Sequence, residues 1–141
     1  MEEIIGKLTA EHVKLTQLAG EILAINGEAL AKSATAAHKT LIAFSATLQN
    51  HIALEDKSLY PACVGHKDPA VREAAQRFLA SRKDLESNYL RFRDEWSTAS
   101  KIQADPRRFR QEVKLQFMSL AQRMFEEDEQ FHPLIVKAFQ R

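Results

Sequence analysis

The chain has 141 residues, which fits one domain and is long enough to bury a substantial apolar core. Its hydrophobic share of 45%, charged share of 28% and net charge of +1 argue against a broad surface for nucleic acid or acidic membranes. The single cysteine, Cys63, excludes an internal disulfide and supplies no thiolate metal motif. The acidic N-terminal segment has no long apolar run, so we expect no signal peptide, no membrane span and a cytoplasmic location.

The few glycines and prolines fall between periodic segments and mark the ends of four predicted helices. Asn26-Gly27 can end the first helix, and Ser33 or Thr35 can begin the second. Asp68-Pro69 and Asp105-Pro106 each combine an N-cap residue with a proline at the first helical position. The predicted helices are 2–26, 34–64, 69–98 and 106–139.

Two prolines lie inside the predicted second and fourth helices, near their C-terminal ends. Proline lacks a backbone N–H and clashes with the preceding helical turn. We therefore expect Pro61 and Pro133 to kink or end these helices.

A stripe of mostly apolar residues, three and four positions apart, runs along each predicted helix. In the first helix it consists of Ile5, Leu8, His12, Leu15, Ala19 and Ile22. Such a stripe is what a helix buries against its neighbours in a bundle. Short connections favour antiparallel neighbours. The sequence therefore predicts an all-α fold, an up-down-up-down four-helix bundle, with residues 1–141 forming a single domain.

Polar residues interrupt these apolar stripes at a few positions, and a buried polar group costs several kcal/mol unless it has a partner. We therefore expect the interrupting side chains to meet in the core. They are His12, His51, Glu55, Arg82 and Glu127, with Arg123 one turn before Glu127.

The chain also contains a weak internal repeat. HIALEDKSLYP, residues 51 to 61, aligns with RMFEEDEQFHP, residues 123 to 133, and LTAEHVKL, residues 8 to 15, aligns with FLASRKDL, residues 78 to 85. The alignment matches His12 with Arg82 and His51 with Arg123. The chain therefore reads as two helical hairpins of one pattern, with histidines in the first and arginines in the second.

His51 and Glu55 are four residues apart, which places them about 40° apart around a helix and lets both contact one ion. Such a pair is weak evidence alone. Here it lies on a core stripe, with His12 and Glu127 on stripes of other helices. Two imidazoles and two carboxylates suit iron, manganese or zinc.

With these motifs the chain resembles the hemerythrin-like (HHE cation-binding) domains. That resemblance implies a four-helix bundle with a carboxylate-bridged di-iron centre used in oxygen binding, sensing or related redox chemistry. The family pattern has a His in helix one, His-x-x-x-Glu in helix two, a His in helix three and His-x-x-x-Glu in helix four. His12 matches the first position, His51 and Glu55 match the second motif, and Glu127 matches the last carboxylate.

The chain departs from that pattern in its second half, where Arg82 and Arg123 replace the two expected histidines. A guanidinium stays protonated and offers no lone pair, so it cannot bind a metal. Two arginines can instead balance the charges of Glu55 and Glu127. The alternative is that they reach the surface over their apolar stems, Arg123 more readily than Arg82.

The remaining histidines are weaker candidates for ligands. His66 falls in a predicted loop, and His38 falls on a different helix face from His51. His132 takes the place of Tyr60 in the repeat. It can be a displaced ligand, but we expect it at a helix end near the rim of the bundle.

We therefore favour a hemerythrin-like domain with a partly lost di-iron site, acting as a metal-poor or metal-free binding or regulatory protein of the sensor type. The alternative is a single-metal protein that holds iron, manganese or zinc through His12, His51, Glu55 and Glu127 for oxygen or redox sensing. At most one transition-metal ion is expected, not a full di-iron centre. No Ser/His/Asp set or phosphate loop indicates an enzyme.

The expected partners follow from the charges. We expect no nucleic acid and no membrane as partner, whereas a protein partner or a homodimer is compatible with the sequence. Arg107, Arg108 and Arg110 form the densest basic stretch, which we interpret as a solvated face. A small anion or a partner protein is the alternative occupant of that stretch.

Overall fold

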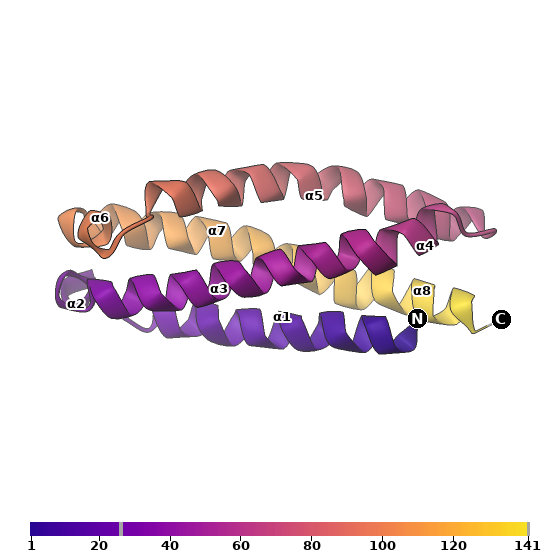
Figure 1. The fold of residues 1–141 in the computed structure, drawn as a ribbon, viewed down its shortest axis with the longest axis horizontal. Coiled ribbons are helices and arrows are strands. Elements are labelled where there is room, and N and C mark those ends of the chain that lie inside the picture. Colours follow the sequence, from indigo (N-terminus) through magenta and orange to yellow (C-terminus); the bar gives the residue numbers. More distant parts are fainter. Residues whose placement is uncertain (26, 141) are drawn as a thin grey trace.

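A computed structural model describes residues 1–25 and 27–140 and shows four long antiparallel helical segments (Figure 1). The first is α1 (Glu2–Leu23) and the third is α5 (Pro69–Glu95). The second runs from α3 (Ala34–Leu54) through the π-helical turn η1 (Glu55–Leu59) into α4 (Tyr60–Val64). The fourth runs from α7 (Pro106–Glu126) through the π-helical turn η2 (Glu127–Phe131) into α8 (His132–Phe139).

The predicted all-α bundle is confirmed, because the described residues contain no strand and successive long segments alternate in direction. Both chain ends lie at the same end of the bundle, as an up-down-up-down order requires (Figure 1). No helix among the described residues is long and apolar enough to cross a membrane.

Two short helices that the sequence did not predict lie at the opposite end of the bundle. They are α2 (Gly27–Lys32) and α6 (Ala99–Ala104), and each buries one apolar side chain, Leu30 and Ile102. Helix α1 ends at Leu23, three residues before the predicted end, and Asn26 lies outside the described residues.

The predicted helix starts are confirmed in detail. The carboxylate of Asp68 accepts a hydrogen bond from the Ala70 N–H, and that of Asp105 accepts one from the Arg108 N–H. Each of these caps satisfies a backbone donor that has no partner within the helix. Helix α3 begins after Ser33, although the Ser33 side chain makes no capping hydrogen bond.

Of the two outcomes expected at Pro61 and Pro133, a kink or an end of the helix, the structure excludes the end, and the predicted last residues 64 and 139 are confirmed. Helices continue past Pro61 to Val64 and past Pro133 to Phe139. In each case a π-helical turn precedes the proline, with the Tyr60 N–H bonded to the Glu55 carbonyl and the His132 N–H to the Glu127 carbonyl. Because the wider turn holds an extra residue, the chain passes the proline without stopping. Both π turns begin at a glutamate singled out by the sequence.

The buried apolar residues form two separate clusters along the bundle. Helices α2 and α6 lie beside the first cluster, which includes Leu15, Leu48, Tyr89 and Leu120. The second lies toward the chain ends and includes Leu8, Leu59, Phe78 and Phe131. On every long segment the polar residues singled out by the sequence fall between the two clusters. These residues form a polar layer across the bundle: His12, His51, Glu55, Arg82, Arg123 and Glu127.

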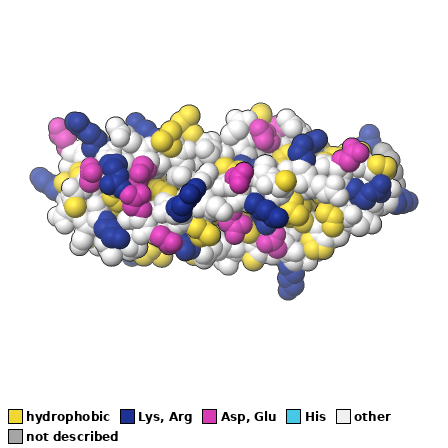
Figure 2. All heavy atoms as spheres, turned by 90° about the horizontal axis from the view of Figure 1, so that it is seen from above, with side chains coloured by type: hydrophobic (Ala, Val, Ile, Leu, Met, Phe, Trp, Pro, Cys, Tyr) yellow, Lys and Arg dark blue, Asp and Glu magenta, His cyan; other side chains and the backbone are white. Residues whose placement is uncertain are grey.

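The surface carries charges of both signs. Over the face that presents α5, Lys and Arg side chains are interspersed with Asp and Glu (Figure 2). This mixture agrees with the net charge of +1.

Candidate metal centre

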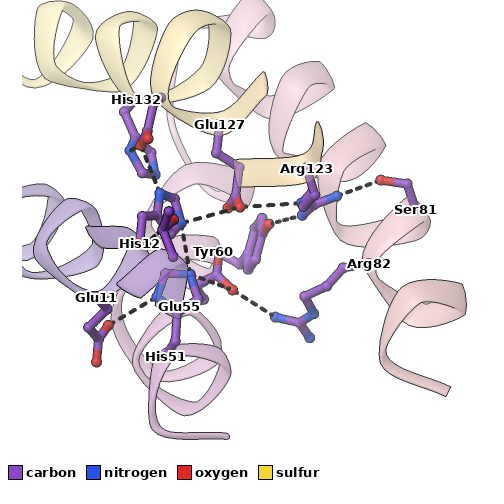
Figure 3. A network of polar contacts seen from close by, with 12 residues as sticks. Glu11, His12, His51, Glu55, Tyr60, Ser81, Arg82, Arg123, Glu127 and His132 are labelled. Atoms are coloured by element: carbon purple, nitrogen blue, oxygen red, sulfur yellow. Dashed lines mark hydrogen bonds and ion pairs between the residues drawn. The ribbon is translucent and has the colours of Figure 1, made fainter. Parts of the chain in front are cut away.

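The polar layer brings together side chains from all four long segments (Figure 3). His12 lies on α1 and His51 on the last turn of α3, and Glu55 and Glu127 open the two π turns. Each of these four residues is at most 4% exposed. Four polar groups so deeply buried require partners, and they find them in one another and in the residues around them.

Three of these residues aim metal-binding atoms at a common point. Ligand atoms of His12, His51 and Glu127 all lie within 4.8 Å of one another. The Nε2 atoms of the two histidines are 3.2 Å apart, and His12 Nε2 is 3.6 Å from Glu127 Oε1. Glu55 adds a fourth donor, since its Oε1 lies 3.8 Å from His51 Nε2. This donor set fits one transition-metal cation.

The outer nitrogen of each histidine is held by a carboxylate. His12 Nδ1 lies 2.8 Å from Asp128 Oδ1, and His51 Nδ1 lies 3.0 Å from Glu11 Oε1. A carboxylate accepts a hydrogen bond from a protonated Nδ1, which leaves the Nε2 lone pair free to face the centre. Neither Glu11 nor Asp128 was predicted from the sequence to lie at this site. The only signal was their position directly beside His12 and Glu127.

The pKa values of the two buried glutamates shift in opposite directions. Burial, and then the charge of Glu127, raises the pKa of Glu55 well above its usual range. Burial also acts on Glu127, but a hydrogen bond with Glu55 and the charge of Arg123 outweigh it and lower the pKa of Glu127. A proton bound by this pair would therefore reside on Glu55 rather than on Glu127. Apart from this pairing, the Oε2 atoms of both have no hydrogen-bond donor among the described residues.

Arg123 is fixed in the interior by contacts to several helices. Its guanidinium donates to Ser81 Oγ at 2.6 Å and to the Tyr60 hydroxyl at 2.8 Å, and its Nε lies 3.5 Å from Glu127 Oε1. The group also stands over the Phe78 ring at 4.9 Å. Arg123 is only 7% exposed. The expectation that Arg123 reaches the surface more readily than Arg82 is therefore wrong, because the Tyr60 hydroxyl and Ser81 satisfy its donors inside the bundle.

Arg82 lies closer to the surface. Its NH1 atom is 2.6 Å from Oδ1 of Asp56, a half-exposed carboxylate, and 3.9 Å from Glu55 Oε1. Its guanidinium also lies over the Tyr60 ring at 5.3 Å. Arg82 thus spans the distance between the buried glutamates and the outside of the bundle.

His132 is buried, at 3% exposed, and the expectation of a place near the rim is wrong. Its ring stacks on that of His12 at 5.8 Å, and its Nδ1 lies 3.4 Å from Asp128 Oδ1. The π turn accounts for this placement, because it changes the direction in which the next residue points. His66 takes no part in the centre, since its Nδ1 accepts a hydrogen bond from the Asp68 N–H in the loop before α5.

The arginines leave donors for one ion rather than two. The positions that would complete a second set of ligands carry guanidinium groups, which have no lone pair to donate. The first-half histidines, by contrast, present both Nε2 atoms to the centre. The residues present therefore fit a single cation.

Comparison with known proteins identifies a cation-binding family. A sequence model described as the hemerythrin HHE cation binding domain matches residues 3–135. Comparisons with curated proteins and with solved structures gave no match. Because the family match spans nearly the whole chain and the polar layer contains a group of candidate cation ligands, the chain belongs to the hemerythrin HHE cation-binding family.

Proposed function

We propose that this protein binds one transition-metal cation, through His12, His51 and Glu127 with Glu55 as a fourth ligand. The observation that carries the proposal is the convergence of the first three on one point, from three different helices, within 4.8 Å. The carboxylates of Glu11 and Asp128 support it, because they hold both imidazoles with Nε2 directed inward.

The surrounding residues set the charge of the site. Glu127 supplies a negative charge beside the histidines, and Glu55 supplies a second one if its proton is released. The guanidiniums of Arg82 and Arg123 add two positive charges in the second half of the layer. We infer that these charges replace a second ion. A bound iron, manganese or zinc ion would supply redox or Lewis-acid chemistry and would tie α1, α3 and η2 together.

A metal-free regulatory protein of the sensor type is the second candidate. It is favoured by the hydrogen-bond distance of 3.2 Å between the two Nε2 atoms, because a second proton on one of the two imidazoles would join them there without a metal ion. A proton on Glu55 and the ion pair between Arg123 and Glu127 would also balance the charge of the two glutamates without a metal ion.

Metal stoichiometry separates the two candidates. Protein purified without chelator or affinity tag would be analysed for bound metals, then titrated with Fe²⁺ under anaerobic conditions, with Mn²⁺ and with Zn²⁺ by calorimetry. We expect one equivalent of one of these ions, and loss of binding in His12→Ala and His51→Ala. His38→Ala and His66→Ala, outside the polar layer, serve as controls. No binding of any ion would favour the metal-free protein, and two equivalents would contradict the proposed role of the arginines.

A further inference from the structure

A groove along α7 has an apolar part, between α1 and α7, and a basic part, between α2 and α7, which meet at one lysine. The apolar part is a cavity of about 330 Å³ with Phe44 and Phe117 among its lining residues. The basic part, of about 710 Å³, lies toward the α2 end and is lined by Arg107 and Arg110, among others. Lys114 lines both parts. The volume of the apolar part is within the range of cavities that hold small ligands.

The apolar part is open because the side chains along it are small. Ala19 and Gly20 of α1 face Ala121 of α7 across it. A β-carbon added at Gly20 would meet no heavy atom within 4 Å, so no close packing requires a glycine there. Glycine inside a helix costs about 1 kcal/mol relative to alanine, yet here the missing side chain leaves room in the groove. Met118 is 69% exposed and can adapt to an apolar occupant.

The basic part gives the groove a polarity. Arg107, Arg110 and Lys114 bring three positive charges, against the single carboxylate of Glu28. Among the residues that the structure describes, Lys114 and Arg107 form no ion pair, and Arg110 donates to the Ile25 carbonyl. An anionic group placed at Lys114 therefore meets an uncompensated ammonium at the mouth of the apolar cavity.

The inner end of the groove lies beside the candidate metal centre. Leu15 is three residues after His12 on α1, and Met124 is three residues before Glu127 on the fourth segment. Three residues are about one helical turn. An occupant of the groove would thus extend from the basic end of the bundle toward the polar layer.

We propose that this groove binds a free single-chain anionic amphiphile, a fatty carboxylate. Its alkyl chain lies between α1 and α7, and its carboxylate pairs with Lys114, with Arg110 and Arg107 beyond it. The charge complementarity at one end and the apolar lining at the other together select this class of ligand. The site does not depend on a metal ion.

The test uses sodium decanoate below its micelle concentration, titrated into the full chain by calorimetry. We expect saturable binding of one decanoate. Butanoate and decyltrimethylammonium should bind at least about tenfold more weakly, because one lacks the chain and the other the negative charge. Equal binding of decyltrimethylammonium would overturn the proposal. Lys114-dependent binding to anionic phospholipid vesicles without binding of decanoate would also overturn it, in favour of a membrane surface.

Two variants locate the site. Gly20→Leu should abolish decanoate binding while keeping the fold, because the added side chain has room and fills the groove. Lys114→Gln should weaken binding by about tenfold. Lys83→Gln, at an exposed lysine on α5, is the matched control and should bind like the parent. Unchanged binding in both Gly20→Leu and Lys114→Gln would show that decanoate lies elsewhere and would refute the assignment.

Discussion

The two arginines of the polar layer differ in what their removal would cost. Arg123→Met removes a buried guanidinium and leaves the Glu127 carboxylate without its ion pair. The Tyr60 hydroxyl and the Ser81 hydroxyl also lose the hydrogen bonds that the guanidinium donates to them. We expect a loss of about 3–5 kcal/mol in the free energy of unfolding. Arg82→Met removes a pair to the half-exposed Asp56 and should cost about 1 kcal/mol.

Urea unfolding of the two variants and the parent shows which substitution lowers the free energy of unfolding more. Arg91→Met, at an exposed position on α5, is the control and should stay within about 0.5 kcal/mol of the parent. A larger cost for Arg82→Met than for Arg123→Met would show that the partly exposed arginine, and not the buried one, holds the layer together.

Cys63 provides a prediction on pH. Burial raises the pKa of its thiol from 9.0 to about 11, because the thiolate would lose its hydration in the apolar core. In the unfolded chain the thiol ionises at lower pH, so its contribution to stability is complete below about pH 9 and is lost as pH rises toward about 11. We expect the unfolding free energy to fall across this window.

In Cys63→Ala the fall in unfolding free energy should be smaller. The difference between the two proteins measures the contribution of the thiol alone, because Tyr60 and Tyr89, whose pKa values are also raised, are present in both. The native parent should also resist alkylation by iodoacetamide at pH 8 and react readily in urea. Rapid alkylation of the folded protein would contradict the burial of the thiol.

At the scale of single residues, the sequence predicted the polar layer but not all of its contacts. The positions of His12, His51, Glu55 and Glu127 on core stripes followed from helical periodicity. The partners Glu11 and Asp128 did not, because a neighbour of a core residue lies by the same periodicity on the flank of the helix, where most charges are solvated. Their role depends on where other helices stand.

The π turns are the elements that the sequence could least predict. Core-facing residues spaced three and four apart fit a regular α-helix, and one extra residue in a single turn changes that spacing only locally. The repeated Glu-Asp-x-x-apolar-aromatic-Pro motif indicated that the same local structure recurs at both sites, but it did not indicate that this structure is a π turn. The short helices α2 and α6 were missed for a related reason, since six residues contain too few turns to show a period.

Deletion of Lys57 tests what the first π turn does. Without the extra residue, η1 can become an ordinary α turn, in which the Pro61 ring would clash with the carbonyl of the preceding helical turn. The helix would then have to kink or end at Pro61, which would move the Tyr60 hydroxyl away from Arg123 and Cys63 out of the core. We expect a large drop in melting temperature by circular dichroism. Deletion of Lys67, in the connection before α5, is the control and should be milder. Equal melting of the two deletions would mean that the extra residue has no structural role.

At the scale of the molecule, the number, direction and approximate bounds of the four long segments were predictable, because amphipathic periodicity and proline-marked starts act over whole segments. The depth of Arg123 and His132 was not, since burial of such groups depends on partners from distant parts of the chain. Tyr60 is 63 residues from Arg123, and Asp128 is 116 residues from His12.

The polar layer also divides the bundle into two parts that can open separately. Each apolar cluster packs within itself, and the layer between them is joined by directional polar contacts rather than by interdigitating side chains. Native-state hydrogen exchange should therefore show two cooperative units, one around Phe44 and Phe117 and one around Phe78 and Phe131. A cation held by His12, His51 and Glu127 would join them, so metal loading should slow exchange in both units. A single unit of uniform protection in the metal-free protein would show that the layer transmits cooperativity unaided.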